Sequence, residues 1–125
     1  NQGQMDRWNI VTILNYLSNK EEEQIIINKI KKMNNKTGKE IIKSMVAIAD
    51  LSRAGFMNGD ISTVMSPRTV LTWAENYLMF NDAEYAFKLS FLNRCDELER
   101  PIIEEYFQRS FGIDISDAKV ANVKE

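Results

Sequence analysis

The stretch that decides the fold runs from Thr37 to Gly55 and reads TGKEIIKSMVAIADLSRAG. Its apolar residues recur at intervals of three and four positions, which places them along one side of an α-helix. They are Ile41, Ile42, Met45, Val46, Ile48, Ala49 and Ala54. Threonine is a common helix N-cap and glycine a common C-terminal stop, so the sequence predicts one long helix, with a buried face, between these two residues.

Three further helices are predicted on the carboxyl side of this stretch. Ser66-Pro67 is typical of a helix start, because serine caps the free amides and proline needs no N–H at the first helical position. Asn81, followed three residues later by Glu84, predicts the next helix. Pro101 begins the last one, and a glycine at position 112 ends it. Four helices in succession indicate a mainly helical domain.

The amino side of the chain is more varied. Asn19, followed by a run of glutamates at 21–23, predicts another helix start. Residues 9–17 are rich in β-branched and aromatic types, which predicts a β-strand. Residues 56–65 leave two alternatives open, a small hairpin or a crossing of the surface. The predicted fold is therefore mainly α, with one amino-terminal strand whose edges require a pairing partner.

Composition excludes several classes of chemistry. The chain has 125 residues, 44% of them hydrophobic, and this suits one soluble domain with its own core. It contains no histidine, so Ser-His-Asp triads and histidine-based zinc sites are excluded. Cys95 is its only cysteine, so no internal disulfide or thiolate metal cage can form, and a reducing cytoplasmic setting is expected. No membrane span or metal site is predicted.

The distribution of charged residues does not identify a binding partner. The formal net charge of −2 argues against a dedicated nucleic-acid binder. One basic segment stands out, with lysines at positions 29, 31, 32, 36, 39 and 43. A solvated surface is the plainer interpretation, because no aromatic residues interleave to stack on bases. An anion or nucleic-acid contact through this segment stays open as the alternative.

Two short stretches imitate nucleotide-binding motifs. Thr37-Gly38-Lys39 looks like the end of a phosphate loop, but Met33 stands where that loop needs glycine and Glu40 where it needs serine or threonine. Residues 46–50 look like an apolar strand ending in a metal-binding aspartate, yet they lie within the helical stripe. Neither stretch predicts nucleotide binding.

Arg68 has the most suggestive position of the charged residues. It follows Ser66-Pro67 in the first turn of a predicted helix, where free amides and the helix dipole favour an anion. Its guanidinium adds a fork that matches phosphate oxygens. Position alone does not distinguish an anion-binding arginine from an ordinary surface arginine, so the second interpretation stays open for Arg68.

Several strings resemble, in chain order, the carboxy-terminal part of the AAA+ ATPase subunit of aerobic cobaltochelatases, in the MoxR-like and magnesium-chelatase-like branch. They are NQGQMDRW at 1–8, SPRT at 66–69 with WAEN at 73–76, FLNRCDELER at 91–100 and EYFQRSFG at 105–112. The run from 93 to 112 is the most specific, whereas SPRT is shared widely across the branch. The similarity is lowest between residues 20 and 43.

The resemblance implies a part of a motor. Residues 1–18 would end the nucleotide-binding core with its last strand, 19–112 would form the helical lid, and 113–125 a polar tail. Arg7 matches the arginine finger that acts in trans on the ATP of a neighbouring subunit. Arg68 matches the sensor 2 arginine, which contacts nucleotide in its own subunit, with Ser66 and Pro67 beside it.

In that family the Walker A and Walker B motifs lie upstream of the position that matches Asn1. ATP and Mg²⁺ are therefore expected as cofactors of an intact parent, and this chain alone is expected to be inactive. The implied partners are the other subunits of a homo-oligomeric ring and larger chelatase or remodelling-target subunits, working in cobalamin biosynthesis. A free-standing helical interaction module without ATPase activity is the alternative.

Overall fold

The computed structural model describes the backbone of residues 2–112 and the side chains of residues 7–112. The predicted polar tail, 113–125, lies outside the described residues. The α-helices are α1 (Gln2–Leu14), α2 (Asn19–Lys29), α3 (Lys36–Asn58), α4 (Pro67–Phe80), α5 (Ala83–Ser90) and α6 (Arg100–Phe111). Two 3₁₀ turns, η1 (Lys31–Met33) and η2 (Leu92–Arg94), join them. The prediction of a mainly helical fold is confirmed for this part of the chain.

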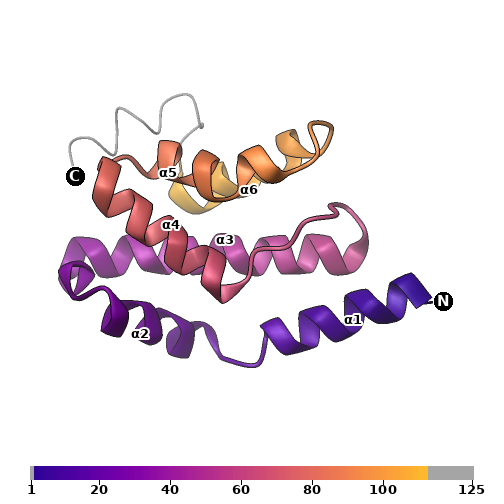
Figure 1. Ribbon diagram of the computed structural model, residues 1–125, viewed down its shortest axis with the longest axis horizontal. Helices are drawn as coiled ribbons and strands as arrows, with labels where there is room; N and C mark the ends of the chain where they lie inside the picture. The colour runs from indigo at the N-terminus through magenta and orange to yellow at the C-terminus, as the bar shows by residue number, and fades with distance from the viewer. Residues whose placement is uncertain (1, 113–125) are drawn as a thin grey trace.

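Helix α3 is the centre of the arrangement. It contacts α1, α2, α4 and α6, and α4 packs in turn on α5. Figure 1 shows α1 and α2 along one side of α3 and α5 and α6 along the other, with α4 crossing between them. No helix within residues 2–112 is long and apolar enough to span a bilayer.

The boundaries of α3 differ slightly from the prediction. Its N-cap is Asn35, not the predicted Thr37, because the side chain of Asn35 accepts a hydrogen bond from the Gly38 amide at 2.7 Å, and the helix therefore begins at Lys36. It continues through Gly55 and ends before Gly59, whose φ of 84° is the left-handed conformation that glycine adopts freely. Gly55 is instead a packing position, since a Cβ there would overlap the hydroxyl of Tyr106 in α6.

The predicted amino-terminal strand is wrong. Residues 9–14 belong to α1, and residues 15–17 form a turn. A helix pairs its backbone groups within its own segment, whereas a single strand leaves both edges unpaired. The β-branched composition at 9–17 was a weak guide, because β-propensity depends on the packing that a neighbouring strand provides.

Helix α1 buries little of its apolar surface. Val11 is buried against the core, but Trp8 and Ile13 are largely exposed, as is Tyr16 in the turn that follows.

Residues 59–66 cross the molecule without forming a strand, so the hairpin alternative is not observed. Ile61 and Met65 of this connection are nevertheless buried, which ties it to the core.

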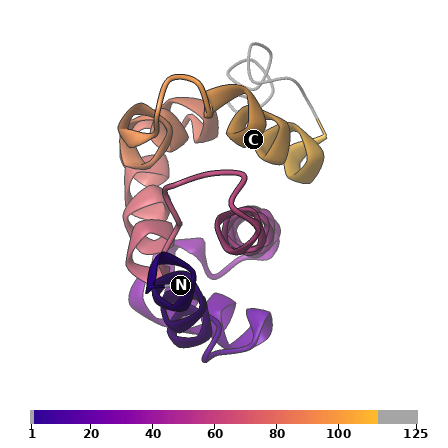
Figure 2. The same ribbon diagram turned by 90° about the vertical axis from the view of Figure 1, so that its right-hand side faces the viewer.

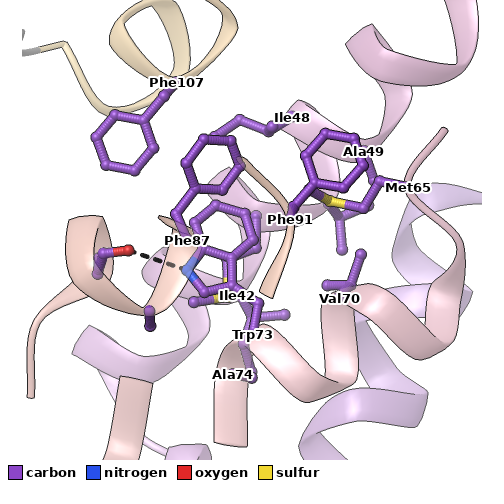
Figure 3. Packing of buried hydrophobic residues seen from close by; sticks show 14 of the residues in the cluster. Ile42, Ile48, Ala49, Met65, Val70, Trp73, Ala74, Phe87, Phe91 and Phe107 are labelled. Atoms are coloured by element: carbon purple, nitrogen blue, oxygen red, sulfur yellow. Dashed lines mark hydrogen bonds between the residues drawn. The ribbon is translucent and has the colours of Figure 1, made fainter. Parts of the chain in front are cut away.

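An aromatic cluster joins the last three helices. Trp73 of α4 is fully buried, with its ring centroid 4.8 Å from that of Phe87 in α5. Phe87 lies 5.1 Å from Phe107 of α6, centroid to centroid. The indole nitrogen of Trp73 donates to the carbonyl oxygen of Ala83 at 3.1 Å, so its polar atom is satisfied inside the core (Figure 3).

The glycine in Thr37-Gly38-Lys39, the stretch that resembles the end of a phosphate loop, has a packing role. A Cβ at position 38 would overlap the carbonyl oxygen of Met33, so only glycine lets the first turn of α3 pack on η1. We expect Gly38→Ala to lower the free energy of unfolding by about 1–2 kcal/mol, because the overpacking outweighs the gain in helix propensity. Urea unfolding followed by circular dichroism measures the change.

Thr37→Ala is the matched control, because the neighbouring Thr37 is exposed. It should leave stability within about 0.5 kcal/mol of the original chain. A Gly38→Ala chain as stable as that control would contradict the packing role of this glycine.

Candidate functional site

The start of α4 has the geometry that the sequence predicted. The hydroxyl of Ser66 accepts a hydrogen bond from the Thr69 amide at 3.2 Å, and Pro67 is the first helical residue. Arg68 follows in the first turn and is exposed. Ser66, Pro67 and Arg68 therefore lie together at a capped helix N-terminus, a place that favours negative charge.

A shallow pocket of about 280 Å³ lies beside this helix start, between α2 and α4. Its lining is partly apolar and partly charged, and it consists of Leu17, Glu22, Ile25, Ile26, Lys29, Pro67, Arg68 and Leu71. The carboxylate of Glu22 is bound by Arg53, which leaves Arg68 and Lys29 as the cations at the pocket. An apolar wall beside two cations fits a ligand that joins an apolar group to an anionic one.

Lys29 is a pocket residue that the sequence did not single out. In the sequence Lys29 is one of six lysines between residues 29 and 43, for which a solvated surface is the plainer interpretation. No sequence pattern links Lys29 with Arg68. Its position three residues after Ile26 and four after Ile25 places it on the same face of α2 as these residues. That face could have been recognised from the sequence, but its approach to α4 could not.

A buried ion pair holds α2 against α3 below this pocket. Nη1 and Nη2 of Arg53 donate to the two carboxylate oxygens of Glu22 at 3.0 and 2.9 Å. The residues are each only 1% exposed. Two parallel charge-assisted bonds of this kind give a defined geometry as well as attraction.

The same arginine also holds the chain just before α4. Nε of Arg53 donates to the carbonyl oxygen of Met65 at 3.0 Å, and the amide of Met65 donates to the hydroxyl of Ser52 at 3.1 Å. Both backbone groups of Met65 are thus bound to side chains of α3, one residue before the cap Ser66. Helix α3 thereby sets the position of the helix start that presents Arg68.

Sequence reasoning missed this network because no motif marks it. The available signal was a charged residue on an apolar face: Arg53 stands four residues after Ala49 and three before Phe56, both of which are buried. A charge at such a position is found inside proteins when it is paired. The partner, Glu22, lies 31 residues away in the sequence, beyond the reach of any local pattern.

Arg7 lies elsewhere, against the carboxyl end of α3. The central carbon of its guanidinium is 5.4 Å from the ring centroid of Phe56. A Cβ placed on Gly59 would stand 3.0 Å from its Nη1. The last turn of α3 has no basic residue of its own, so Arg7 supplies a cation where the free carbonyls favour one. Arg68 instead borders the pocket between α2 and α4, so the fold does not bring the two predicted arginines together.

The single cysteine, Cys95, is buried, and potential metal ligands do not cluster in residues 7–112. Burial raises the pKa of the Cys95 thiol to about 11, so the thiolate that would attack or bind a metal is scarce at neutral pH. No group of three or more Cys, Asp or Glu side chains in this part of the chain could hold a metal ion.

Comparison with known proteins bears directly on this helical unit. The chain is 54% identical over 123 residues to the aerobic cobaltochelatase subunit CobS of Sinorhizobium sp. The chain is therefore similar to CobS. This confirms the resemblance to the aerobic cobaltochelatase subunit that the sequence predicted. The match covers 98% of this chain but 37% of CobS, so the chain spans little more than a third of that protein's length.

The similarity to CobS extends over nearly the whole chain and so includes the pocket at the start of α4. No protein-family model matches the chain, and no solved structure matches it significantly. The relationship to CobS therefore rests on sequence identity, and the helical arrangement described above adds where its residues lie.

Proposed function

We propose that this chain is the lid and carboxy-terminal part of a cobaltochelatase-type AAA+ ATPase. In this proposal ATP binding and hydrolysis in a ring of subunits drive metal insertion, or the remodelling of a partner. The observation that carries it is the 54% identity to CobS over nearly the whole chain. Residues 19–112 are then the lid, and residues 1–18 end the nucleotide-binding core.

Arg68 is the residue that contacts nucleotide in its own subunit. Its support is the place of Arg68 beside the free amides of α4 and at the mouth of a pocket with an apolar wall. A guanidinium binds phosphate oxygens in pairs, and Lys29 adds a second, single-point cation. ATP and Mg²⁺ are the expected cofactors of the intact ATPase, in which ATP supplies the phosphoryl group and Mg²⁺ neutralises its charge.

Arg7 acts on the nucleotide of the neighbouring subunit. In the described chain the half-buried Arg7 lies over the buried ring of Phe56, a cation–π contact that contributes about 0.5–2 kcal/mol. Leaving that contact to reach a phosphate therefore costs less than the rate gain of about 10³-fold or more that an arginine finger supplies. An arginine supplied in trans makes hydrolysis conditional on assembly, so the proposed partners are copies of the same subunit and, beyond them, larger chelatase or remodelling-target subunits.

The lid assignment is tested by replacing Arg68 in the complete ATPase. A hydrogen bond to a charged group contributes about 1.5–3 kcal/mol, so we expect Arg68→Ala to weaken ATP binding by about 10- to 100-fold. Isothermal calorimetry with a non-hydrolysable ATP analogue measures this change. Arg68→Lys should recover part of the affinity, because it restores the charge without the fork.

Arg109→Ala is the matched control, since Arg109 lies on the exposed face of α6 and, among the described residues, forms an ion pair only with Glu105, at 3.5 Å. It should bind the analogue as tightly as the unaltered ATPase. Equal affinities for Arg68→Ala and Arg109→Ala would overturn the assignment of Arg68.

A further inference from the structure

Positive charge is concentrated in the segment from residue 29 to residue 43. The segment holds six lysines and one acid, Glu40, whereas the rest of the chain holds ten basic and seventeen acidic residues. The formal charge is therefore +5 within the segment and −7 outside it. The six lysine side chains are all exposed. Because Lys29 borders the pocket at α4, the other five, Lys31, Lys32, Lys36, Lys39 and Lys43, are called here the lysine surface.

The fold gathers these five lysines at one end of the molecule, at the turn where α2 leads into α3 (Figure 1). The side chain of Asn35 joins the two parts of the surface, because it donates to the carbonyl oxygen of Lys32 at 2.9 Å and accepts from the Gly38 amide. Lys36, Lys39 and Lys43 follow at intervals of three and four residues on one face of α3. The five lysines thus lie on η1 and on the first turns of α3.

The lysine surface is not paired with acids within residues 7–112, since no ion pair among these residues involves one of its members. Lys36 and Lys39 stand in the first turns of α3, where the helix dipole is positive and where no acid occurs in the first turn. Lys39 and Lys43, four residues apart, also repel each other. Folding alone favours the opposite charges at these positions, so their arrangement points to an external anion.

Acidic side chains lie near the opposite end of α3, where Arg7 is also found. The carboxylate of Glu99 accepts from the Ser62 amide at 2.9 Å, which places it beside the connection that follows α3. Asp60 and Asp96 are exposed in the same region. At 1.5 Å per residue, the 23 residues of α3 separate the two ends by about 34 Å. Figure 2 looks onto the end of the molecule where the amino end of α1 lies, away from the lysine surface.

We propose that the lysine surface docks an acidic segment of another polypeptide, rich in glutamate and aspartate. Lysines on flexible stems pair with separate carboxylates and need no fixed geometry. A nucleic acid is the poorer fit, because no aromatic side chain lies among these lysines to stack on a base. The charge of −7 on the rest of the chain also repels a long polyanion more strongly than a short acidic segment. This inference is independent of any contact between Arg68 and nucleotide.

The test is the binding of a fluorescently labelled glutamate-rich peptide, followed by anisotropy at low and high salt. The complete chain should bind it at low salt and release it as salt rises. The triple variant Lys32→Gln, Lys36→Gln and Lys39→Gln should bind about 10-fold more weakly, since exposed ion pairs contribute about 0.2–1 kcal/mol each. Urea unfolding of the same variant checks that it is folded.

A matched triple variant, Lys20→Gln, Lys88→Gln and Arg109→Gln, changes the net charge equally at other surfaces and should retain full affinity. An equal loss in both triple variants would show a net-charge effect and overturn the proposal. Tighter binding of an equally charged single-stranded DNA would assign the surface to nucleic acid instead. Self-association that only the first triple variant abolishes would assign it to a second copy, and absence of peptide binding at low salt would likewise overturn the proposal.

Discussion

Replacing Arg53 with methionine should lower the free energy of unfolding by about 3–5 kcal/mol, which is the usual cost of leaving one member of a buried ion pair without its partner. The substitution keeps the volume of the side chain but leaves Glu22, which is 1% exposed, without its charged partner. It also removes the donor to the Met65 carbonyl oxygen. Urea unfolding of the complete chain, followed by circular dichroism, measures the loss.

Two further variants separate pairing from packing. The double variant Glu22→Leu, Arg53→Met replaces both charges by apolar groups and should recover the part of the stability lost through the unpaired Glu22, whereas the Met65 carbonyl oxygen still lacks its donor. Arg109→Met removes an ion pair whose side chains are 58% and 64% exposed, so its effect should stay below about 0.5 kcal/mol. An Arg53→Met chain that unfolds at the same urea concentration as Arg109→Met would contradict the structural role of the buried pair.

Replacing Arg7 with alanine should affect the proposed ATPase much more than it affects the fold. Loss of an arginine finger lowers the rate of phosphoryl transfer by about 10³-fold or more, because the finger stabilises the charge on the γ-phosphate in the transition state. Within the chain, the substitution removes the cation–π interaction with the buried ring of Phe56, which contributes about 0.5–2 kcal/mol. Steady-state ATP turnover of the complete ATPase and urea unfolding of this chain measure the two effects separately.

Mixing experiments test whether Arg7 acts in trans. Subunits with Arg7→Ala should depress the turnover of unaltered neighbours, so activity falls faster than the fraction of unaltered subunits. With Arg68→Ala subunits, the ATP turnover should fall in proportion to the fraction of altered subunits, because Arg68 acts within its own subunit. Proportional loss with both variants would show that Arg7 is not a trans finger.

Local signals predicted most of the helices because each depends on neighbours in sequence. The capping hydroxyl of Ser66, the ring of Pro67 and the apolar stripe of α3 all act within a few residues of their own position. The structure confirms each, with the N-cap of α3 two residues earlier than predicted and its C-terminal glycine four residues later. Gly55 misled the prediction of that end because its lack of a side chain makes room for Tyr106 of α6, a packing relationship that no local pattern contains.

The prediction of a strand in the amino-terminal segment was wrong because a strand depends on residues that are distant in sequence. The β-branched residues of this segment favour a strand only where another strand supplies hydrogen bonds and packing. Within residues 2–112 the segment is helical and packs on α3 instead. The candidate site was predicted in part: Arg68 and its cap were recognised, whereas Lys29 and the pair of Glu22 with Arg53 were not.

The sequence by itself determined the mainly helical class, the start of α4 with its exposed arginine, and the relationship to cobaltochelatase subunits, because helix caps, periodicity and strings of identical residues are all local in the chain. The tertiary structure alone decided which residues share the pocket with Arg68, where Arg7 lies, and how α3 holds Met65. These depend on side chains that meet across as many as 31 positions, and such meetings follow from packing of whole helices against one another.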